Sequence, residues 1–132
     1  MDRQDYALQF LEHYESPRHH GPLADADVVA RGENPGCGDI ITIYMRVNGG
    51  GVAEQVQFEG EGCTISLAAA SMLMEMVQGK TLAEIQALDY NDLLDSIGRD
   101  VVLTRVRCAS LGLKTLKEAV RQYYTQQLQP SA

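Results

Sequence analysis

The chain has 132 residues, 45% of them hydrophobic, which is enough to bury one core without disulfides or a metal, so a single domain over residues 1–132 is expected. A net charge of −7 argues against a nucleic-acid partner. No apolar run approaches the roughly 20 residues of a membrane span, the start lacks a signal pattern, and three cysteines fit poorly with a secreted disulfide framework, so we expect a cytoplasmic protein without a membrane partner.

The first predicted element is a helix over residues 5–14. Tyr6, Phe10 and Tyr14 share one face at i, i+4 spacing, with Leu11 beside them, and His13 is expected on the flank of this helix. Ser16-Pro17 ends the helix, and the loop over residues 18–26 follows.

Three strands are predicted next. A short strand is expected over residues 27–32, and residues 40–47 and 52–59 predict a hairpin around the turn Asn48-Gly49-Gly50-Gly51. Strict alternation in the last strand would place on one side Val52, Glu54, Val56 and Phe58.

After Cys63 the composition changes to that of helices. Residues 64–78 predict a buried helix in which the methionines pack in the core, with Gly79 just beyond its end. Thr81-Leu82-Ala83-Glu84 is a capping-box pattern that starts another helix. A short helix capped by Asn91 and ending at Gly98 is expected, then a long one over residues 109–127. Strands first and helices after predict an α+β fold.

The three cysteines are the main candidates for chemistry. Cys37 and Cys63 lie beside glycines, in Gly36-Cys37-Gly38-Asp39 and Gly60-Glu61-Gly62-Cys63, where the missing side chains allow backbone to crowd around a ligand. Cys63 and Cys108 each directly precede a predicted helix, whose positive dipole end favours the thiolate. The spacing between the cysteines is too long for a zinc ribbon. Three buried cysteines acting as small hydrophobic side chains are the alternative, but the local sequences favour a shared site.

Asp39 is the candidate fourth ligand. Three thiolates and one carboxylate make a set of the kind that zinc or an iron–sulfur cluster needs. Oxygen is a harder ligand than sulfur, so Asp39 would hold a soft cluster least firmly. An aspartate that merely stabilises a turn before a strand is the alternative, which the sequence leaves open.

The segment around the third cysteine is basic within an acidic chain. Arg105 and Arg107 flank Cys108, and their guanidinium groups would offset the negative charge of four anionic ligands. His19 and His20 are adjacent and point apart in extended chain, so they are not expected to bind one metal together.

Four segments, in the same order, resemble those of the U-type iron–sulfur cluster assembly scaffold family, which comprises IscU, SufU and the N-terminal part of NifU. They are His13-Tyr14-Glu15-Ser16-Pro17-Arg18, Asn34-Pro35-Gly36-Cys37-Gly38-Asp39, Phe58-Glu59-Gly60-Glu61-Gly62-Cys63-Thr64-Ile65-Ser66 and Arg105-Val106-Arg107-Cys108-Ala109. The resemblance implies a small three-stranded antiparallel sheet covered by helices, of the SufE/NifU-like kind. It also implies that a [2Fe–2S] cluster, or zinc in the cluster-free form, is held by Cys37, Asp39, Cys63 and Cys108.

The function that the resemblance implies is that of a scaffold. It accepts sulfur from a cysteine desulfurase at Cys37, Cys63 or Cys108, builds the cluster and passes it to apo iron–sulfur proteins. Such a protein is a carrier rather than an enzyme, and a monomer or weak homo-oligomer. The desulfurase is expected to contact the basic stretch that includes Lys114. The alternative is a zinc-dependent, persulfide-accepting sulfurtransferase of SufU type. A structural zinc domain without a transfer role is the third possibility.

Two departures from the IscU pattern bear on this choice. Arg107 stands where IscU proteins usually have histidine, and Val101-Val102-Leu103-Thr104-Arg105 stands where they carry the chaperone-binding stretch L-P-P-V-K. Docking of a dedicated Hsp70 chaperone is therefore not expected. Both features favour the SufU type, yet the chain between Cys63 and Cys108 is too short for the insertion usual in SufU proteins. The resemblance thus leaves both activities open.

Overall fold

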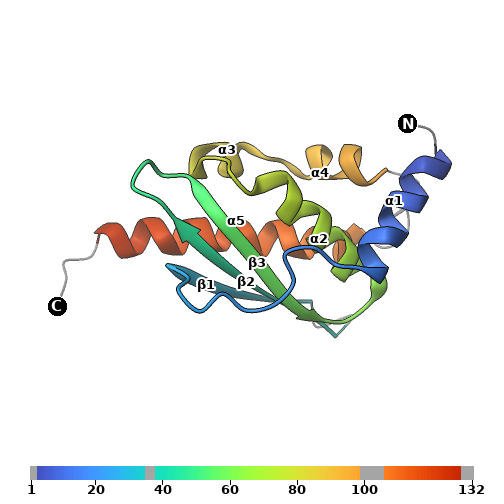
Figure 1. Ribbon diagram of the computed structural model, residues 1–132, viewed down its shortest axis with the longest axis horizontal. Coiled ribbons are helices and arrows are strands. Elements are labelled where there is room, and N and C mark those ends of the chain that lie inside the picture. Colours follow the sequence, from blue (N-terminus) through green and yellow to red (C-terminus); the bar gives the residue numbers. More distant parts are fainter. Residues whose placement is uncertain (1–2, 35–37, 99–105, 129–132) are drawn as a thin grey trace.

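A three-stranded antiparallel sheet carries helices on one face (Figure 1). The computed structural model describes residues 3–34, 38–98 and 106–128. The strands are adjacent in chain order, β1 (Val28–Asn34), β2 (Asp39–Val47) and β3 (Ala53–Glu61). The expected α+β class with a small antiparallel sheet is confirmed.

The central strand β2 shows why this sheet forms. Every second residue is buried on the helix side, and the residues between are half-buried on the other side. The buried apolar side chains of β2 are Ile41, Ile43, Met45 and Val47. The predicted glycine turn after Val47 is present, with the N–H of Gly51 donating to the carbonyl of Asn48 at 3.1 Å.

Strict alternation fails at the start of β3. The pairing of β2 with β3 shifts between Arg46 and Val47, so that Val47 pairs with Ala53 while Arg46 pairs with Gln55. The extra residue, Glu54, is exposed and Ala53 takes the buried position. We predicted that one side of the strand carries Val52, Glu54, Val56 and Phe58, and this was wrong. The extra residue of a β-bulge reverses the side to which the preceding residues point.

Two helices cover the sheet directly. Helix α5 (Val106–Leu128) packs against β1 and β2, and α2 (Thr64–Val77) packs beside it against β3. A side chain at Gly112 of α5 would lie 3.6 Å from the Cα of Ala70 in α2, so the two helices approach closely there. The buried residues of α2 are mostly apolar, and Met72 and Met74 are buried in the core as predicted.

The remaining helices form an outer layer. Helix α1 (Arg3–Glu15) packs on α2 and α4, α3 (Leu82–Ala87) on α5, and α4 (Tyr90–Ile97) on α2. The capping box of Thr81 and Glu84 is present at the start of α3. Helix α4 is capped by Asp89 rather than by Asn91, because Asp89 and Asp92 accept each other's backbone N–H at 3.0 and 2.9 Å.

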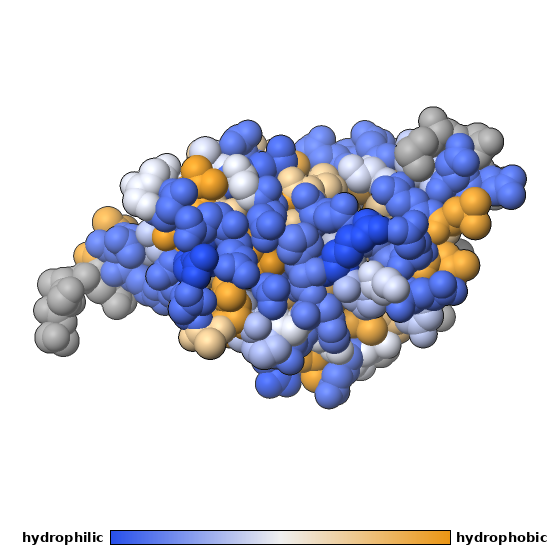
Figure 2. Space-filling view, in the orientation of Figure 1, coloured by the Kyte–Doolittle hydropathy of each residue, from blue (hydrophilic) through white to orange (hydrophobic). Residues whose placement is uncertain are grey.

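Helix α1 is turned relative to the prediction. Phe10 is buried as expected, but Tyr14 is 42% exposed and His13, expected on the flank, is 2% exposed. The buried face thus follows i, i+4, i+7 from Tyr6 to Phe10 and His13. Apolar side chains remain exposed on this helix, among them Leu8 and Leu11. Figure 2 shows apolar surface at the end of the molecule where α1 lies in Figure 1.

The loop after α1 runs along the outer edge of β3. The N–H of Gly21 donates to the carbonyl of Phe58, and the N–H of Phe58 donates to the carbonyl of His19, both at 2.8 Å. The ring of His20 packs against that of Phe58 at 5.3 Å between centroids. Among the described residues, no helix is long and apolar enough to span a membrane.

Candidate metal centre

Asp39 and Cys63 meet at one end of the sheet. Asp39 is the first residue of β2, and Cys63 is the residue just before α2. Asp39 is 1% exposed, whereas Cys63 is half-buried. Two of the four predicted ligands, from different elements, are therefore neighbours.

The carboxylate of Asp39 holds the start of α2. Its Oδ1 accepts the backbone N–H of Cys63 at 2.8 Å. Cys63 is the N-cap of α2 and makes no capping bond with its own side chain. The carboxylate from β2 accepts the N–H of this N-cap residue, the donor that the third residue of a helix accepts in a capping box. This bond stabilises the negative charge of a carboxylate that is otherwise removed from water.

The same carboxylate faces the thiol. Its Oδ2 lies 4.0 Å from the Sγ of Cys63. Two ligands of one tetrahedral zinc, with Zn–S of about 2.3 Å and Zn–O of about 2.0 Å, lie about 3.5 Å from each other. The distance is therefore close to that of two ligands that share one metal, and the donor pair fits the predicted site.

Gly62 makes this approach possible. Its φ is +142°, a conformation that favours glycine, and a Cβ there would overlap with Oδ1 of Asp39 and lie 2.9 Å from its Cα. The absence of a side chain at Gly62 thus leaves the space beside Cys63 that Asp39 occupies.

The other two predicted ligands are described less fully. Cys37 lies outside the described residues. Cys108 lies within the first turn of α5, since that helix begins at Val106, and not just before the helix as predicted. Its side chain lies outside the described part, as do Arg105 and the side chain of Arg107. Among the described residues, no three side chains of His, Cys, Asp or Glu come together as a metal site.

The two helices that carry Cys63 and Cys108 start at the same end of the molecule. Figure 1 shows α2 and α5 running across the sheet in the same general direction, both beginning where β3 ends and β2 starts. The positive ends of two helix dipoles therefore face the end of the sheet at which Asp39 and Cys63 meet.

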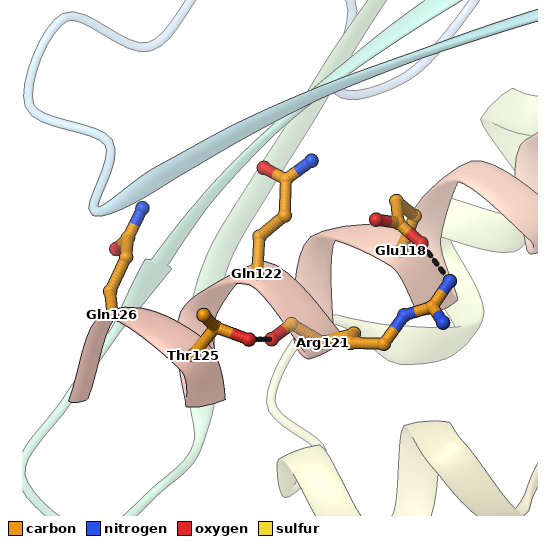
Figure 3. A pocket seen from close by; sticks show the side chains of 5 residues that line it. All are labelled: Glu118, Arg121, Gln122, Thr125 and Gln126. Carbon is orange, nitrogen blue, oxygen red and sulfur yellow. Dashed lines mark hydrogen bonds and ion pairs between the residues drawn. The ribbon is translucent and has the colours of Figure 1, made fainter. Parts of the chain in front are cut away.

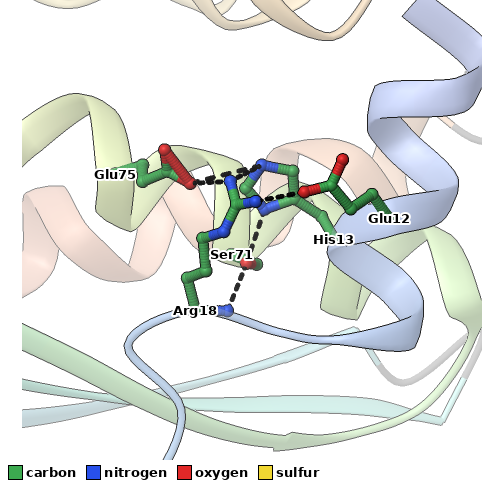
Figure 4. Close-up of polar contacts among 5 residues, drawn as sticks. All are labelled: Glu12, His13, Arg18, Ser71 and Glu75. Atoms are coloured by element: carbon green, nitrogen blue, oxygen red, sulfur yellow. Dashed lines mark hydrogen bonds and ion pairs between the residues drawn. The ribbon is translucent and has the colours of Figure 1, made fainter.

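A partly buried polar cluster between α1 and α2 was not predicted from the sequence (Figure 4). The Nδ1 of His13 lies 2.7 Å from the Oγ of Ser71, which also accepts the backbone N–H of Arg18 at 2.8 Å. The Nη1 of Arg18 lies 3.2 Å from the Nε2 of His13 and forms an ion pair with Glu75. We call these four residues, together with Glu12, which pairs with Arg18, the α1–α2 latch.

The contacts of His13 with Ser71 and Arg18 fit a neutral ring. A guanidinium can only donate, so Arg18 forms a hydrogen bond to Nε2 only when that nitrogen is unprotonated, and the proton then lies on Nδ1 and is donated to Ser71. The Nε2 also lies 3.4 Å from the carboxylate of Glu75, which would pair with a protonated ring. Burial lowers the pKa of His13 and outweighs the opposing effect of Glu75. The hydrogen bond from Arg18 lowers the pKa of Glu75. The i, i+7 spacing of His13 from Tyr6 was the signal that could have placed His13 inside.

A hollow on α5 lies apart from the Asp39–Cys63 contact (Figure 3). It measures about 520 Å³, and its lining comes from one helix: Glu118, Arg121, Gln122, Thr125 and Gln126. Arg121 pairs with Glu118, and the hydroxyl of Thr125 donates to the carbonyl of Arg121 at 3.0 Å. These contacts are those of an ordinary solvated helix face. The hollow begins about 15 Å along α5 from Cys108.

The chain matches the family described as "NifU-like N terminal domain" over residues 5–130. The "Iron-sulfur cluster assembly scaffold protein IscU" of Aquifex aeolicus is 36% identical over 93% of this chain and 78% of its own length. The "Zinc-dependent sulfurtransferase SufU" of Bacillus subtilis is 35% identical over 87% of this chain and 88% of its own length.

The fold has matches among solved structures. A protein of Fervidobacterium islandicum, described as an iron–sulfur cluster assembly scaffold for the SUF system, superposes with a TM-score of 0.71 at 28% identity. The match covers 85% of this chain and 93% of that one. The family match over nearly the whole sequence, the relatives above 30% identity and this shared fold agree with one another. The chain therefore belongs to the NifU-like N-terminal domain family, together with the IscU and SufU proteins.

Proposed function

We propose that this protein is a scaffold on which a [2Fe–2S] cluster is assembled and from which it is passed to apo iron–sulfur proteins. The observation that carries the proposal is the contact of the Asp39 carboxylate with the backbone and sulfur of Cys63. A buried carboxylate beside a thiol at a helix N-terminus supplies two of the donor groups that a metal site needs. The name of the A. aeolicus relative supports the same function.

The proposed ligands of the cluster are Cys37, Asp39, Cys63 and Cys108. Cys37 precedes Asp39 by two residues, and Cys108 lies in the first turn of α5, which starts at the same end of the molecule as α2. The donor set of three thiolates and one carboxylate suits zinc as well as an iron–sulfur cluster. We therefore propose that the cluster-free protein binds zinc at the same residues.

Sulfur is proposed to arrive as a persulfide on a cysteine desulfurase. One thiolate of this chain attacks the outer sulfur, the sulfur–sulfur bond breaks, and the desulfurase leaves as a thiolate. The sulfur then remains on this chain as a cysteine persulfide. Conversion of each such sulfur into sulfide requires two electrons from an external reductant. The cysteine that reacts first must be reachable from outside, and Cys63 is half-buried.

The second candidate is a zinc-dependent sulfurtransferase. It is favoured by the 35% identity with the zinc-dependent SufU of B. subtilis and by Arg107 in place of the histidine usual in IscU proteins. In this function the same four residues would hold zinc, and the persulfide would be passed on without building a cluster. A bound zinc ion would supply positive charge that keeps the thiolates ionised.

Contact with the desulfurase is proposed to involve the first half of α5. Lys114 is exposed on this helix. Reversing its charge, Lys114→Glu, should slow association with the desulfurase, most strongly at low salt, where charge steering is least screened. Lys80→Glu is the matched control, because Lys80 follows the far end of α2. Equal association rates of the two variants at low ionic strength would place the interface elsewhere.

The deciding experiment is cluster assembly from purified components. The protein is purified without air, its iron, acid-labile sulfide and zinc are measured, and it is incubated with desulfurase, cysteine, ferrous iron and reductant. A scaffold should gain the visible absorbance of a [2Fe–2S] cluster and then transfer it to an apo-ferredoxin. Cys108→Ser should weaken zinc and cluster binding by well over tenfold.

The two candidate functions give different outcomes in this experiment. Persulfide formation on the protein without iron uptake or cluster absorbance would reject the scaffold and support the sulfurtransferase. Zinc content alone does not separate them, since both are proposed to bind zinc. Wild-type affinity in Cys108→Ser would remove Cys108 from the site.

A further inference from the structure

Ser66 lies one helical turn after Cys63 and touches its sulfur. Its side chain is 1% exposed, so it belongs to the interior of the molecule. Its Oγ lies 3.5 Å from the Sγ of Cys63, within hydrogen-bonding distance for a sulfur atom. Cys63 is the N-cap of α2 and Ser66 is the third residue of the helix, so the two are three residues apart. Side chains three residues apart lie on the same side of a helix.

The chemistry of the two groups fixes the direction of this bond in a loaded site. A hydroxyl can donate or accept, and a neutral thiol can also do either weakly. A metal-bound cysteine is a thiolate, which has no hydrogen to give. The 3.5 Å contact can therefore be a hydrogen bond in the loaded protein only if Ser66 donates and the sulfur accepts.

We propose, building on the metal centre proposed above, that Ser66 is a positioning residue for the Cys63 thiolate and donates an O–H···S hydrogen bond to it when the site is loaded. Cys63 is then held twice, at its backbone N–H by Asp39 and at its sulfur by Ser66. The hydrogen bond withdraws electron density from this sulfur and fixes its direction toward the metal.

Two consequences follow for the bound group. Hydrogen bonds to ligand sulfurs are among the factors that set the reduction potential of an iron–sulfur cluster, and each one favours the reduced, more negative state. Loss of the Ser66 hydroxyl should therefore lower the potential. It should also make Cys63 a stronger electron donor to any metal, which is measurable without a cluster.

Cobalt(II) provides a direct probe of that donor strength. The wild-type protein and the variants Ser66→Ala and Ser66→Thr are loaded with one equivalent of cobalt without air. The absorption bands that arise from charge transfer from sulfur to cobalt are then recorded. These bands should move to longer wavelength in Ser66→Ala, because an electron-rich sulfur is easier to oxidise, and return toward the wild-type position in Ser66→Thr, which keeps a hydroxyl.

Ser71→Ala is the matched control for packing. Ser71 lies on the same helix, is fully buried, and contacts His13 and Arg18 rather than Cys63. Its bands should stay at the wild-type position even if the protein is less stable. Thermal unfolding and the cobalt-to-protein ratio show that each variant compared is folded and loaded.

The outcomes separate this inference from the proposed function. A band shift confined to Ser66→Ala supports it, even if Ser66→Thr fails to load cobalt. Unshifted bands in Ser66→Ala, or an equal shift in Ser71→Ala, would overturn it while the metal centre stands. Absence of any sulfur-to-cobalt band in the wild-type protein would instead refute the proposed metal centre on which this inference rests.

Discussion

At the scale of single residues, Asp39 and Cys63 are joined before any metal arrives. Asp39 Oδ1 is committed to the backbone N–H of Cys63, and its Oδ2 faces the sulfur. The bond at the start of α2 thus also orients a proposed ligand. Its geometry depends on the absence of a side chain at Gly62, whose place is filled by the carboxylate.

Gly62→Ala tests this dependence. The new Cβ would overlap with the Asp39 carboxylate, so the capping bond should break and zinc affinity should fall by at least tenfold, as expected for displacement of one ligand. Zinc affinity is measured by competition with a chromophoric chelator. Gly51→Ala is the control, since Gly51 also has positive φ, +75°, but has open space around it. If both variants lose affinity equally, backbone strain rather than the Asp39 contact is the cause.

Asp39→Ala is expected to change the lifetime and the delivery of a bound cluster, and not only the affinity of the protein for it. In the proposed site the carboxylate is the hardest donor among sulfur ligands, so we expect an acceptor's thiolate to enter most readily at its position. Alanine also removes one negative charge. A bound cluster should therefore be longer-lived and its delivery slower. Absorbance decay and transfer to an apo-ferredoxin are followed without air. Faster loss with undiminished transfer would make Asp39 a simple stabilising ligand.

At the scale of elements, β1 and α5 approach each other closely, and this contact fixes the position of α5, the helix that contains Cys108. Gly32 of β1 faces Thr115 of α5, whose hydroxyl donates to the carbonyl of Leu111 at 2.8 Å. Thr115 is buried, so this contact belongs to the core. The position of α5 over the sheet thus depends on a residue without a side chain.

Gly32→Ala should destabilise the protein by about 1–3 kcal/mol, the usual cost of overpacking a core. Its Cβ would overlap with the Thr115 hydroxyl and lie 3.2 Å from the Thr115 Cβ. Urea unfolding measures the loss, with Gly49→Ala, which has open space, as the control. Adding Thr115→Ala to Gly32→Ala should restore part of the stability. If it restores none, the strain arises elsewhere.

The elements themselves were largely predictable, because hydrophobic period and turn residues are local signals. The hairpin, the buried helix after Cys63 and the capping box at Thr81 all appear as predicted. Two of the failures have a non-local cause, because strand pairing placed a bulge at Glu54 and contact with Ser71 turned His13 inward. The third was a local signal that was misread, since Asp89 and Asp92 form a capping box at the start of α4.

Only part of the geometry around Asp39 and Cys63 could be predicted from the sequence. Glycines beside Cys63 indicated crowding, and the structure shows Asp39 filling the space next to Gly62. The bond between Asp39 and the Cys63 N–H could not be predicted, because it joins residues 24 positions apart in the chain. The contact of Ser66 with the sulfur of Cys63 is local but was not predicted either, because it depends on where α2 begins.

At the scale of the whole molecule, the α1–α2 latch couples the N-terminal helix to the helix that carries Cys63. Burial holds the pKa of His13 below the value of about 6.5 that it has in the unfolded chain. The unfolded state therefore binds more protons as pH falls below about 6.5, so stability that is complete above this pH is lost toward the folded-state pKa. The pKa of Glu75 is lowered from 4.5, so its own contribution is lost only at more acidic pH.

His13→Gln should separate this effect from others. At pH 7.5 the variant should be less stable by about 1–3 kcal/mol, the cost of disrupting a buried polar network. Between pH 7.5 and 5.5 it should lose less stability than the wild-type protein, because it lacks the titrating group. Urea midpoints at the two pH values give both quantities. An equal loss on acidification in the two proteins would assign the pH dependence to groups other than His13.

The two outer strands of the sheet are protected from pairing with another chain in different ways. An open strand edge is a template for strand addition and aggregation. On β3, the main-chain bonds of His19 and Gly21 to Phe58 already occupy that template. On β1, the exposed, paired charges of Arg31 and Glu33 make strand addition unfavourable. A protein whose proposed work is to be repeatedly emptied and refilled thus guards both outer strands with contacts of its own residues rather than of its cargo.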